Sequence, residues 1–412
     1  MRNLKGARLL VLSDRYPHIG DPISSSFVKS QIECLKDRFE RIYVISLAPW
    51  IPKFLSHFSF MDSKGRYDGY AEDYRYDNVE VYFAKPLAFP LEFSRKRRPD
   101  DSLRSTIKII RENNIKFDLI HAHFTLPSGY VGAKIKEAYG KELILTVHED
   151  RNWLLTEISA GDRKAYEAWQ NADIIIRVNK ADLNEFERIN IDNSRLVYIP
   201  NGFSPGRFKL MDKMKARMML GLPQSEKLLL NIAALEPYKG QEYLVDAMNK
   251  VLAAKENVAL YVVGKGSLKD HLQSLIDRYG INNWVHLAGG NKTAEEIVLW
   301  MNACDLFVLP SLSEGNPTVM FEALGCGKPF LGTRVGGVPE IIINRKLGIL
   351  VEPKDANALA EAIMEAIDKE WDNRYILDYA SRFSWEIICQ QIADQYIAVL
   401  EKRWDENAID NR

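Results

Sequence analysis

The chain has 412 residues, of which 46% are hydrophobic, and it carries 55 basic against 56 acidic side chains for a net charge of −1. This length suggests roughly two to three domains with real cores. The balanced charge gives no global field that attracts nucleic acid, so we expect no nucleic-acid partner. The four cysteines lack the spacing of a metal site or a disulfide framework, and they fit a reducing cytosol.

The sequence predicts neither an export signal nor a membrane span. The apolar run before Asp14 has five residues, which is too short for the core of a signal peptide. No uninterrupted apolar segment approaches the roughly 18 residues of a membrane-spanning helix. We therefore expect a cytoplasmic protein.

Apolar runs bounded by turn residues alternate with amphipathic segments along the whole chain, a pattern typical of stacked βα units. The candidate strands are residues 8–12, 41–46, 79–83, 119–122, 143–147, 174–178 and 196–199, then 228–233, 259–263, 285–288, 306–309, 330–333 and 348–351. The fold class is therefore α/β, with two Rossmann-like domains and a cleft where they join. We place the domains at residues 1–192 and 193–384, and a terminal helix at residues 385–412.

The loop after the first strand runs from Ser13 to Gly20, and the serines at 24–26 are candidate caps for a helix that begins near Phe27. Arg15 and His18 lie in this loop and are candidates for contact with a phosphate or an acceptor. An ordinary strand-to-helix turn explains the loop almost as well.

Between residues 48 and 98, aromatic side chains stand beside a basic run, Arg95-Lys96-Arg97-Arg98. Two interpretations stay open. One is a surface that touches anionic lipid headgroups or binds a lipid-linked acceptor, with peripheral association at the inner face of the cell membrane. The other is loop packing beside a solvated basic run.

Two later strands end in histidines, His121 and His123 on one and His148 on the other. Both strand ends point these side chains toward the predicted cleft. We predict that His121 is a packing residue whose hydrogen bonds are satisfied, because a lone histidine is more often structural than catalytic. His123 is a candidate for acceptor binding, and His148 is the stronger candidate for a catalytic role.

The second half opens with a strand and a turn that ends in Lys239-Gly240. Phosphates need cations, and Lys239 is placed to reach a diphosphate, although a solvated turn lysine is the simpler alternative. Gly264 and Gly266 follow the next strand. They lack the third glycine that a dinucleotide-binding fingerprint requires.

The most informative segment follows the apolar run at residues 306–309, where Glu314 precedes Gly315-Asn316-Pro317 and a predicted helix from Thr318. In open α/β sheets this edge binds ligands, and a helix N-terminus there suits a phosphate. Glu322 lies about two helical turns after Glu314. A metal site would want more oxygen or histidine ligands, so we favour the binding of sugar and ribose hydroxyls.

Glu314 and Glu322 resemble the E-x7-E motif of the retaining glycosyltransferases of family GT4, which have the two-domain GT-B fold. The resemblance implies that Glu322 binds the ribose of a nucleotide-sugar and that Glu314 contacts the donor sugar. It also implies that the backbone of residues 315–318 cradles sugar and phosphate. Thr146-Val147-His148 matches the family histidine beside the donor sugar and the departing phosphate, whose role is orientation in the transition state.

Further matches extend the resemblance over nearly the whole chain. Gly20 matches a family glycine that faces the donor phosphates, and the turn at Gly264 and Gly266 lies close to the nucleotide in the family. The terminal helix crosses back to the first domain, which binds the acceptor. Two departures stand out: Ala234 replaces an arginine that many members carry, and Glu149 follows His148. The cations that we consider as substitutes for this arginine are Arg15, Lys265 and Lys292.

The sequence therefore predicts a retaining, metal-independent glycosyltransferase of hexosyltransferase type (EC 2.4) without a cofactor. It would transfer a sugar from a UDP- or GDP-hexose to a hydroxyl of a growing polysaccharide or lipid-linked glycan, as in cell-envelope biosynthesis. Another GT-B enzyme, such as a sugar-nucleotide epimerase or a glycogen-synthase-like polymerase, is the nearest alternative. A non-catalytic scaffold that binds nucleotide-sugars is a third, suggested by Ala234 alone.

Overall fold

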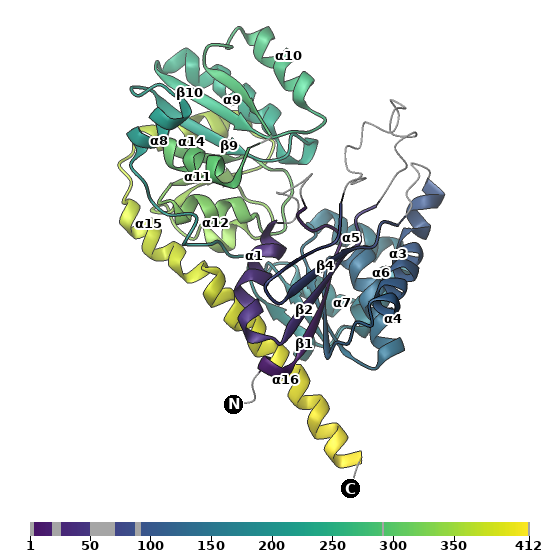
Figure 1. Cartoon of the computed structure of the whole chain (residues 1–412). Coiled ribbons are helices and arrows are strands. Elements are labelled where there is room, and N and C mark those ends of the chain that lie inside the picture. The colour runs from purple at the N-terminus through teal and green to yellow at the C-terminus, as the bar shows by residue number, and fades with distance from the viewer. Residues whose placement is uncertain (1–3, 19–25, 50–70, 87–91, 291, 411–412) are drawn as a thin grey trace. The chain divides into compact units, whose positions relative to one another are not determined.

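The computed structural model describes residues 4–18, 26–49, 71–86, 92–290 and 292–410, with residues 26, 92–96 and 402–410 described by their backbone only. The chain divides into two compact units, residues 1–200 with 385–412 and residues 201–384. In each unit, helices cover both faces of a β-sheet (Figure 1).

The first unit holds an eight-stranded sheet with the order β3-β4-β2-β1-β5-β6-β7-β8. Its strands are β1 Arg8–Ser13, β2 Arg41–Ser46, β3 Tyr74–Tyr76, β4 Val79–Phe83, β5 Leu119–His123, β6 Glu142–Val147, β7 Ile174–Arg177 and β8 Leu196–Tyr198. Its helices are η1 Leu4–Gly6, α1 Ser26–Leu35, η2 Lys36–Arg38, α3 Glu92–Glu112, η4 Thr125–Gly129, α4 Tyr130–Tyr139, α5 Arg151–Ala160, α6 Arg163–Asn171, α7 Leu183–Arg188, η5 Asn193–Arg195 and α16 Trp385–Asp410. Strand β3 pairs antiparallel with β4, and the other neighbouring strands pair in parallel.

The strands of this sheet are buried on both faces because successive side chains of a strand point in opposite directions. Leu9 and Val11 of β1 belong to a core with residues of α1 and α16. Leu10 and Leu12 belong to a second core with residues of α4 and α6. Burial on both faces explains why these strands read as continuous apolar runs rather than as alternating ones.

The terminal helix α16 belongs to the first unit and packs beside α1. The hydroxyl of Tyr396 on α16 hydrogen bonds with Nδ1 of His121 at 2.6 Å. The other ring nitrogen of His121, Nε2, hydrogen bonds with the hydroxyl of Thr146 at 2.8 Å. His121 thus has both nitrogens engaged inside the core, as a structural histidine does.

The second unit holds a six-stranded parallel sheet with the order β11-β10-β9-β12-β13-β14. Its strands are β9 Lys227–Ile232, β10 Val258–Val263, β11 Val285–Gly289, β12 Leu306–Leu309, β13 Phe330–Thr333 and β14 Gly348–Val351. Its helices are α8 Lys213–Leu220, η6 Pro237–Lys239, α9 Gln241–Ala254, α10 Lys269–Tyr279, α11 Ala294–Ala303, α12 Thr318–Gly325, α13 Val338–Ile341, α14 Ala356–Asp368, α15 Asn373–Ala380 and η7 Ser381–Phe383. Leu229 faces a core with α9, α10 and α14, while Leu228 and Leu230 face another with α11 and α12.

The predicted α/β fold with two parallel-sheet units is confirmed, and two details differ from the sequence analysis. Strand β8 pairs with β7, so the first unit continues to Pro200 rather than ending at residue 192. The short strand β3 was not predicted, because Tyr74-Arg75-Tyr76 is only three residues long, has an exposed Arg75 at its centre and lies at the sheet edge. Within the described residues, no helix combines the length and hydropathy that a membrane span requires.

The two ends of the second unit are fastened to each other. The backbone N–H of Phe203 donates to the carbonyl of Phe383 at 3.0 Å, and Phe203 forms a β-bridge with Ser384. The ring of Phe203 also lies so close to Gly325 that a Cβ there would collide with it. Helix α12 therefore packs directly against the first residues of the unit.

A buried arginine joins four elements at the amino edge of the second sheet. Arg217 of α8 donates to the carbonyls of Ala303 and Glu226, both at 2.9 Å, and to the carboxylate of Asp305 at 2.6 Å. Asp305 also accepts the backbone N–H of Leu228 at 2.8 Å. Helices α8 and α11 and the starts of β9 and β12 are thus tied by one guanidinium, which is 1% exposed.

We expect Arg217→Met to destabilise the protein by roughly 3 to 5 kcal/mol, because it leaves buried polar groups without their donor. A lower melting temperature and a lower denaturant midpoint by circular dichroism would report this loss. Met218→Ala is the matched control, because Met218 is the next residue of α8 and is 74% exposed. This substitution should change the free energy of unfolding by no more than about 0.5 kcal/mol. Equal melting of Arg217→Met and the wild type would contradict the prediction.

Candidate active site

The loop between β12 and α12 holds Glu314 in a defined position. The side chain of Glu314 is 7% exposed, and its Oε1 accepts hydrogen bonds from Lys239 Nζ and from Ser311 Oγ, both at 2.6 Å. Lys239 comes from the turn after β9, the neighbour of β12 in the sheet. The structure therefore brings two predicted site residues, 75 positions apart in sequence, into direct contact.

The turn that carries Lys239 packs tightly against the start of this loop. Gly240 has a φ of 65°, and a Cβ there would collide with the carbonyl of Pro310. The backbone N–H of Leu312 donates to the carbonyl of Tyr238 at 2.7 Å. The glycine after Lys239 is thus required by both its conformation and its close neighbour.

The opposite side of the loop is supported by the segment that follows β13. A Cβ at Gly336 would collide with the carbonyl of Glu314, and the backbone N–H of Gly337 donates to the carbonyl of Gly315 at 2.8 Å. These glycines let two backbones approach closely.

The start of α12 is anchored through Asn316. The amide of Asn201 donates to the backbone carbonyl of Asn316 at 2.7 Å, and the backbone N–H of Asn201 donates to the Asn316 side chain at 3.2 Å. Pro317 occupies the N-cap and Thr318 begins the helix. Among the described residues, the buried Nδ2 of Asn316 has no hydrogen-bond partner, so its N–H groups are able to donate to a ligand.

Gly264 and Gly266 are explained by packing between turns. A Cβ at Gly264 would collide with the carbonyl of Ala233, and one at Gly266 with the carbonyl of Leu235. These glycines bring the turn after β10 against the turn after β9. Position 234 presents only a methyl group, and the carbonyl of Ala234 accepts a hydrogen bond from Gln241 at 2.8 Å.

Glu322 lies on α12 among apolar neighbours. Burial raises the pKa of its carboxyl to about 7, and the positive charge of Arg207 acts in the opposite direction. Arg207 was absent from the predicted site, because it precedes the domain's first strand and belongs to no recognisable motif. It is the one cation among the described residues that lowers the pKa of Glu322.

In the first unit, the carboxyl ends of β5 and β6 bring His123 and His148 together. Nδ1 of His123 hydrogen bonds with Nε2 of His148 at 3.0 Å, and the two rings are nearly parallel. Burial lowers the pKa of His123 to about 3 and that of His148 well below its ordinary value. Both rings are therefore neutral near pH 7, and the buried Nδ1 of His148 has no partner among the described residues.

Two carboxyl groups that the sequence analysis did not select lie at the same edge. Asp14 follows β1 and accepts a hydrogen bond from the hydroxyl of Ser128 at 2.5 Å. Glu149 follows β6 and accepts one from the backbone N–H of Thr125 at 2.5 Å. Burial raises the pKa of Asp14 to about 6 and, together with the charge of Asp14, that of Glu149 to about 7.

Asp14 and Glu149 follow the ends of strands, and this position is also the sequence feature that led to the selection of His123 and His148. Ser13, at the end of β1, stands in register with His123, and His123 with Thr146. Asp14 is the next residue after Ser13, and Glu149 comes three residues after Thr146. The buried Oε2 of Glu149 has no hydrogen-bond partner in the described part of the chain, so it is able to receive a ligand hydroxyl.

The remaining candidates of the first unit have separate places. His18 is buried and packs edge-on against Phe83, while Arg15 and Arg98 are the cations that lower the pKa of Asp14. Part of the basic run at residues 95–98 thus acts on a strand end. Gly20 lies outside the described residues, as does most of the aromatic segment, residues 50–70 and 87–91.

The strand ends of the first unit offer carboxyl oxygens and neutral imidazoles, which suit the hydroxyl groups of a ligand. In the second unit, a carboxylate and a lysine suit a ligand that carries hydroxyl and phosphate groups. Within the described residues, no group of three or more His, Cys, Asp or Glu side chains is arranged to hold a metal ion.

Comparison with known proteins agrees with this chemistry. Residues 212–383 match the family described as Glycosyl transferases group 1, and residues 64–207 match Glycosyltransferase Family 4. An uncharacterized glycosyltransferase of Methanocaldococcus jannaschii is 30% identical over 328 residues, 78% of this chain and 85% of the relative. D-inositol 3-phosphate glycosyltransferase of Segniliparus rotundus is 28% identical over 336 residues, 76% of this chain and 74% of the relative.

A Bacillus subtilis glycosyltransferase, whose name refers to teichuronic acid biosynthesis, is 32% identical over 262 residues, 63% of this chain and 64% of the relative. Among solved structures, sucrose-phosphate synthase of Thermosynechococcus elongatus superposes with a TM-score of 0.77 at 20% identity, over 96% of this chain and 100% of that one. Anabaena HepE in complex with UDP-glucose superposes with a TM-score of 0.71 at 22% identity, over 95% and 100% of the two chains. The chain therefore belongs to the group 1 glycosyltransferases of the GT4 type and has the GT-B fold.

Proposed function

We propose that this glycosyltransferase is a retaining hexosyltransferase that uses a UDP- or GDP-hexose. It transfers the sugar to a hydroxyl of a growing polysaccharide or lipid-linked glycan, without a metal ion or a cofactor. It works in the cytoplasm or at the inner face of the cell membrane. The observation that carries the proposal is the contact of Lys239 and Ser311 with Glu314.

This contact joins the two chemical functions that a nucleotide-sugar site requires. Glu314 offers a carboxylate to the hydroxyls of the donor sugar, and Lys239 offers a cation to the diphosphate. Both stand beside the first turn of α12, whose N–H groups favour a bound phosphate. Charge that develops on the departing diphosphate would be stabilised there, which is where we expect most of the rate enhancement to arise.

The names of similar proteins support a nucleotide-sugar donor. HepE was solved with UDP-glucose and also with UDP and glucose, which favours UDP as the first nucleotide to test. The relative named for teichuronic acid biosynthesis favours a polysaccharide acceptor. Ala234 leaves Lys239 as the main cation of the turn after β9, and Arg207 adds a second positive charge near Glu322.

We assign acceptor binding to the strand ends of the first unit. Glu149 presents an uncommitted buried oxygen and His148 an uncommitted ring nitrogen. Hydrogen bonds from these groups suit the hydroxyls of a sugar. Neutral His148, whose Nε2 is held by the hydrogen bond with His123, would orient the reacting groups rather than attack as a nucleophile.

Donor binding provides the first test. We expect UDP-glucose or GDP-mannose to bind the wild type, and Lys239→Ala to weaken that binding at least about tenfold, or about 1.4 kcal/mol. Isothermal titration measures the change. Lys269→Ala, an exposed lysine on α10 of the same unit, is the matched control. Wild-type affinity in Lys239→Ala would refute the assigned role. Incubation of the enzyme with the donor alone distinguishes the alternatives. Slow hydrolysis of the donor indicates a transferase rather than a scaffold, and isomerisation of the donor indicates an epimerase.

Donor affinity should depend on pH through Glu322. Its carboxyl has a pKa of about 7, and only the ionised form accepts two hydroxyl hydrogen bonds. Affinity for UDP-glucose should therefore rise up to about tenfold between pH 6 and pH 8, following the ionised fraction. Glu322→Gln should bind more weakly and without this pH dependence. Glu361→Gln, at an exposed acid of α14, is the control. If donor affinity depends on pH equally in the two variants, Glu322 is not the group that causes this dependence.

His148→Ala should lower kcat by about 100-fold or more, as the loss of a transition-state hydrogen bond does, with a smaller change in donor KM. Because the wild-type ring is neutral near pH 7, kcat at saturating substrates should show no titration with a histidine-like pKa near 6.5. Steady-state kinetics from pH 5.5 to 8.5 test both points. The control is His271→Ala, an exposed histidine of α10; equal rates for the two variants would refute the assignment.

At saturating donor, kcat/KM for the acceptor should rise between pH 6 and pH 8 as Glu149 ionises and accepts an acceptor hydroxyl. Glu149→Gln keeps an oxygen for the Thr125 N–H but cannot ionise, so it should remove this rise. Glu157→Gln on α5 serves as the control. A rise that persists in Glu149→Gln would assign the titration to another group, Asp14 first.

A further inference from the structure

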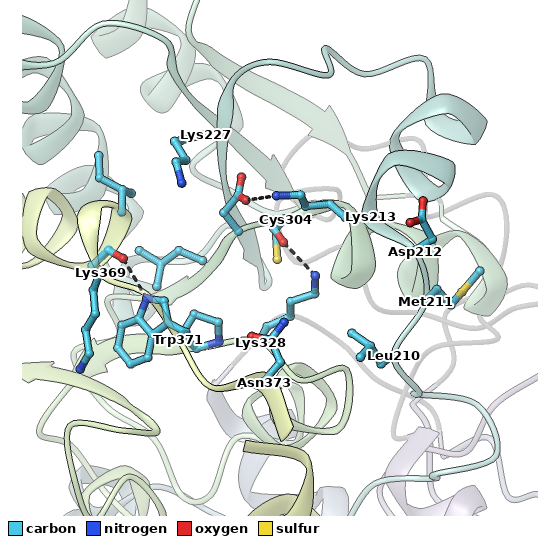
Figure 2. A pocket seen from close by; sticks show the side chains of 15 residues that line it. Leu210, Met211, Asp212, Lys213, Lys227, Cys304, Lys328, Lys369, Trp371 and Asn373 are labelled. Carbon is cyan, nitrogen blue, oxygen red and sulfur yellow. Dashed lines mark hydrogen bonds and ion pairs between the residues drawn. The ribbon is translucent and has the colours of Figure 1, made fainter. Parts of the chain in front are cut away.

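The second unit contains a cavity at the amino edge of its sheet, away from the candidate donor site at the carboxyl edge. Its volume is about 580 Å³, within the range of small-molecule sites. Lys227 is the first residue of β9, Leu306 is the first of β12, and Pro329 directly precedes β13. Figure 2 shows the cavity with the side chains that surround it.

One part of the lining is apolar and includes an aromatic ring. Leu306, Pro329 and Ile367 are buried and form this part together with Trp371. The indole N–H of Trp371 donates to the carbonyl of Ala366 at 2.9 Å, which fixes the ring. A fixed indole beside aliphatic side chains suits the flat face of a sugar or a base.

The other part of the lining is cationic. Lys328 is 5% exposed and donates to the carbonyls of Asn302 and Cys304, at 2.8 and 3.0 Å. These carbonyls lie at the end of α11, so Lys328 also caps that helix. An ammonium has three N–H donors, and one of them remains for a ligand. Burial lowers the pKa of Lys328, an effect that a bound anion would oppose.

Two further lysines complete the cationic part. Lys213 Nζ contacts Asp305 at 2.6 Å and keeps two donors, while the side chain of Lys227 is exposed and has no hydrogen-bond or ion-pair partner among the described residues. In Figure 2 the amino ends of Lys213, Lys227 and Lys328 face the open centre, and Trp371 lies across from Lys227. The side chain of Lys369 runs away from this centre.

Both carboxylates that line the cavity already have partners. Asp305 is shared by Lys213 and Arg217 and accepts the backbone N–H of Leu228. Asp212 accepts the backbone N–H of Lys215 as the N-cap of α8. Lys213, Lys227 and Lys328 thus bring three positive charges to a cavity whose two carboxylates already have partners. This excess of positive charge suits the negative charge of a phosphate monoester.

We propose that this cavity binds a small phosphorylated ring compound, a sugar phosphate or a nucleoside monophosphate, as a second ligand site of the enzyme. The phosphate contacts Lys213, Lys227 and Lys328, and the ring lies against Trp371. The site is separate from donor binding because its residues come from the opposite edge of the sheet. The inference therefore does not depend on the function proposed above.

Isothermal titration of the full chain with four probes tests the site. Glucose 6-phosphate and adenosine monophosphate distinguish the sugar from the nucleotide source. Inorganic phosphate and glucose present the two halves of the ligand separately. We expect one of the phosphorylated ring compounds to bind at one per chain, at least about tenfold more tightly than inorganic phosphate, and no binding of glucose. Inorganic phosphate binding as tightly as both ring compounds would overturn the proposal.

Variants locate the binding. Lys227→Glu reverses an exposed charge and should fold like the wild type. It should lower the affinity for the probe at least about tenfold. Lys215→Glu, an exposed lysine of α8 that does not line the cavity, and the donor-site variant Glu322→Gln should both bind like the wild type. Three outcomes would overturn the proposal. The first is that no phosphorylated probe binds the wild type at about 10 mM. The others are that Lys215→Glu loses as much probe affinity as Lys227→Glu, or that Glu322→Gln loses probe affinity.

Discussion

The parallel direction of the strands is the constraint on which the rest of the structure depends. Parallel strands start at one edge of a sheet and end at the other, so residues that follow different strands meet without being close in sequence. In the second sheet this brings Lys239, after β9, to Glu314, after β12. In the first it brings Asp14, His123 and Glu149 to the same edge of the sheet. The amino edge gathers a different set, around Arg217, where the elements are held together by buried charge.

The two carboxyl edges treat charge differently. In the second unit Glu314 is already matched by Lys239 and Ser311, so that acid is held ready at little electrostatic cost. In the first unit Asp14 and Glu149 are buried close enough for the charge of one to raise the pKa of the other. Such displaced pKa values concentrate at functional sites. In the second unit the same kind of displacement is found at Glu322, which lies on α12 among apolar neighbours.

The strands could be predicted from the sequence because both faces of each sheet are covered, which makes most strands continuous apolar runs. The three-residue edge strand Tyr74–Tyr76, with an exposed arginine at its centre, lacks that signal. Spacing and loop position were sufficient to select Glu314, Lys239 and His148, whose roles remain predictions. Spacing was not sufficient to select Asp14, whose partner Ser128 lies on another element. The contact between Lys239 and Glu314 depends on sheet order, and sheet order is set by packing that no single segment encodes.

The fastening of Phe203 to Phe383 and Ser384 has a mechanical consequence. The two chain segments that join the units leave the second unit from one place, so they form one joint rather than two independent hinges. Rotation at such a joint is taken up by the few backbone bonds beside it, at residues 200–202 and 384–385. Because Gly325 leaves room for the ring of Phe203 against α12, the helix that carries Glu322 rests on this joint. A larger side chain at position 325 would therefore disturb the ends of the second unit and helix α12 at once.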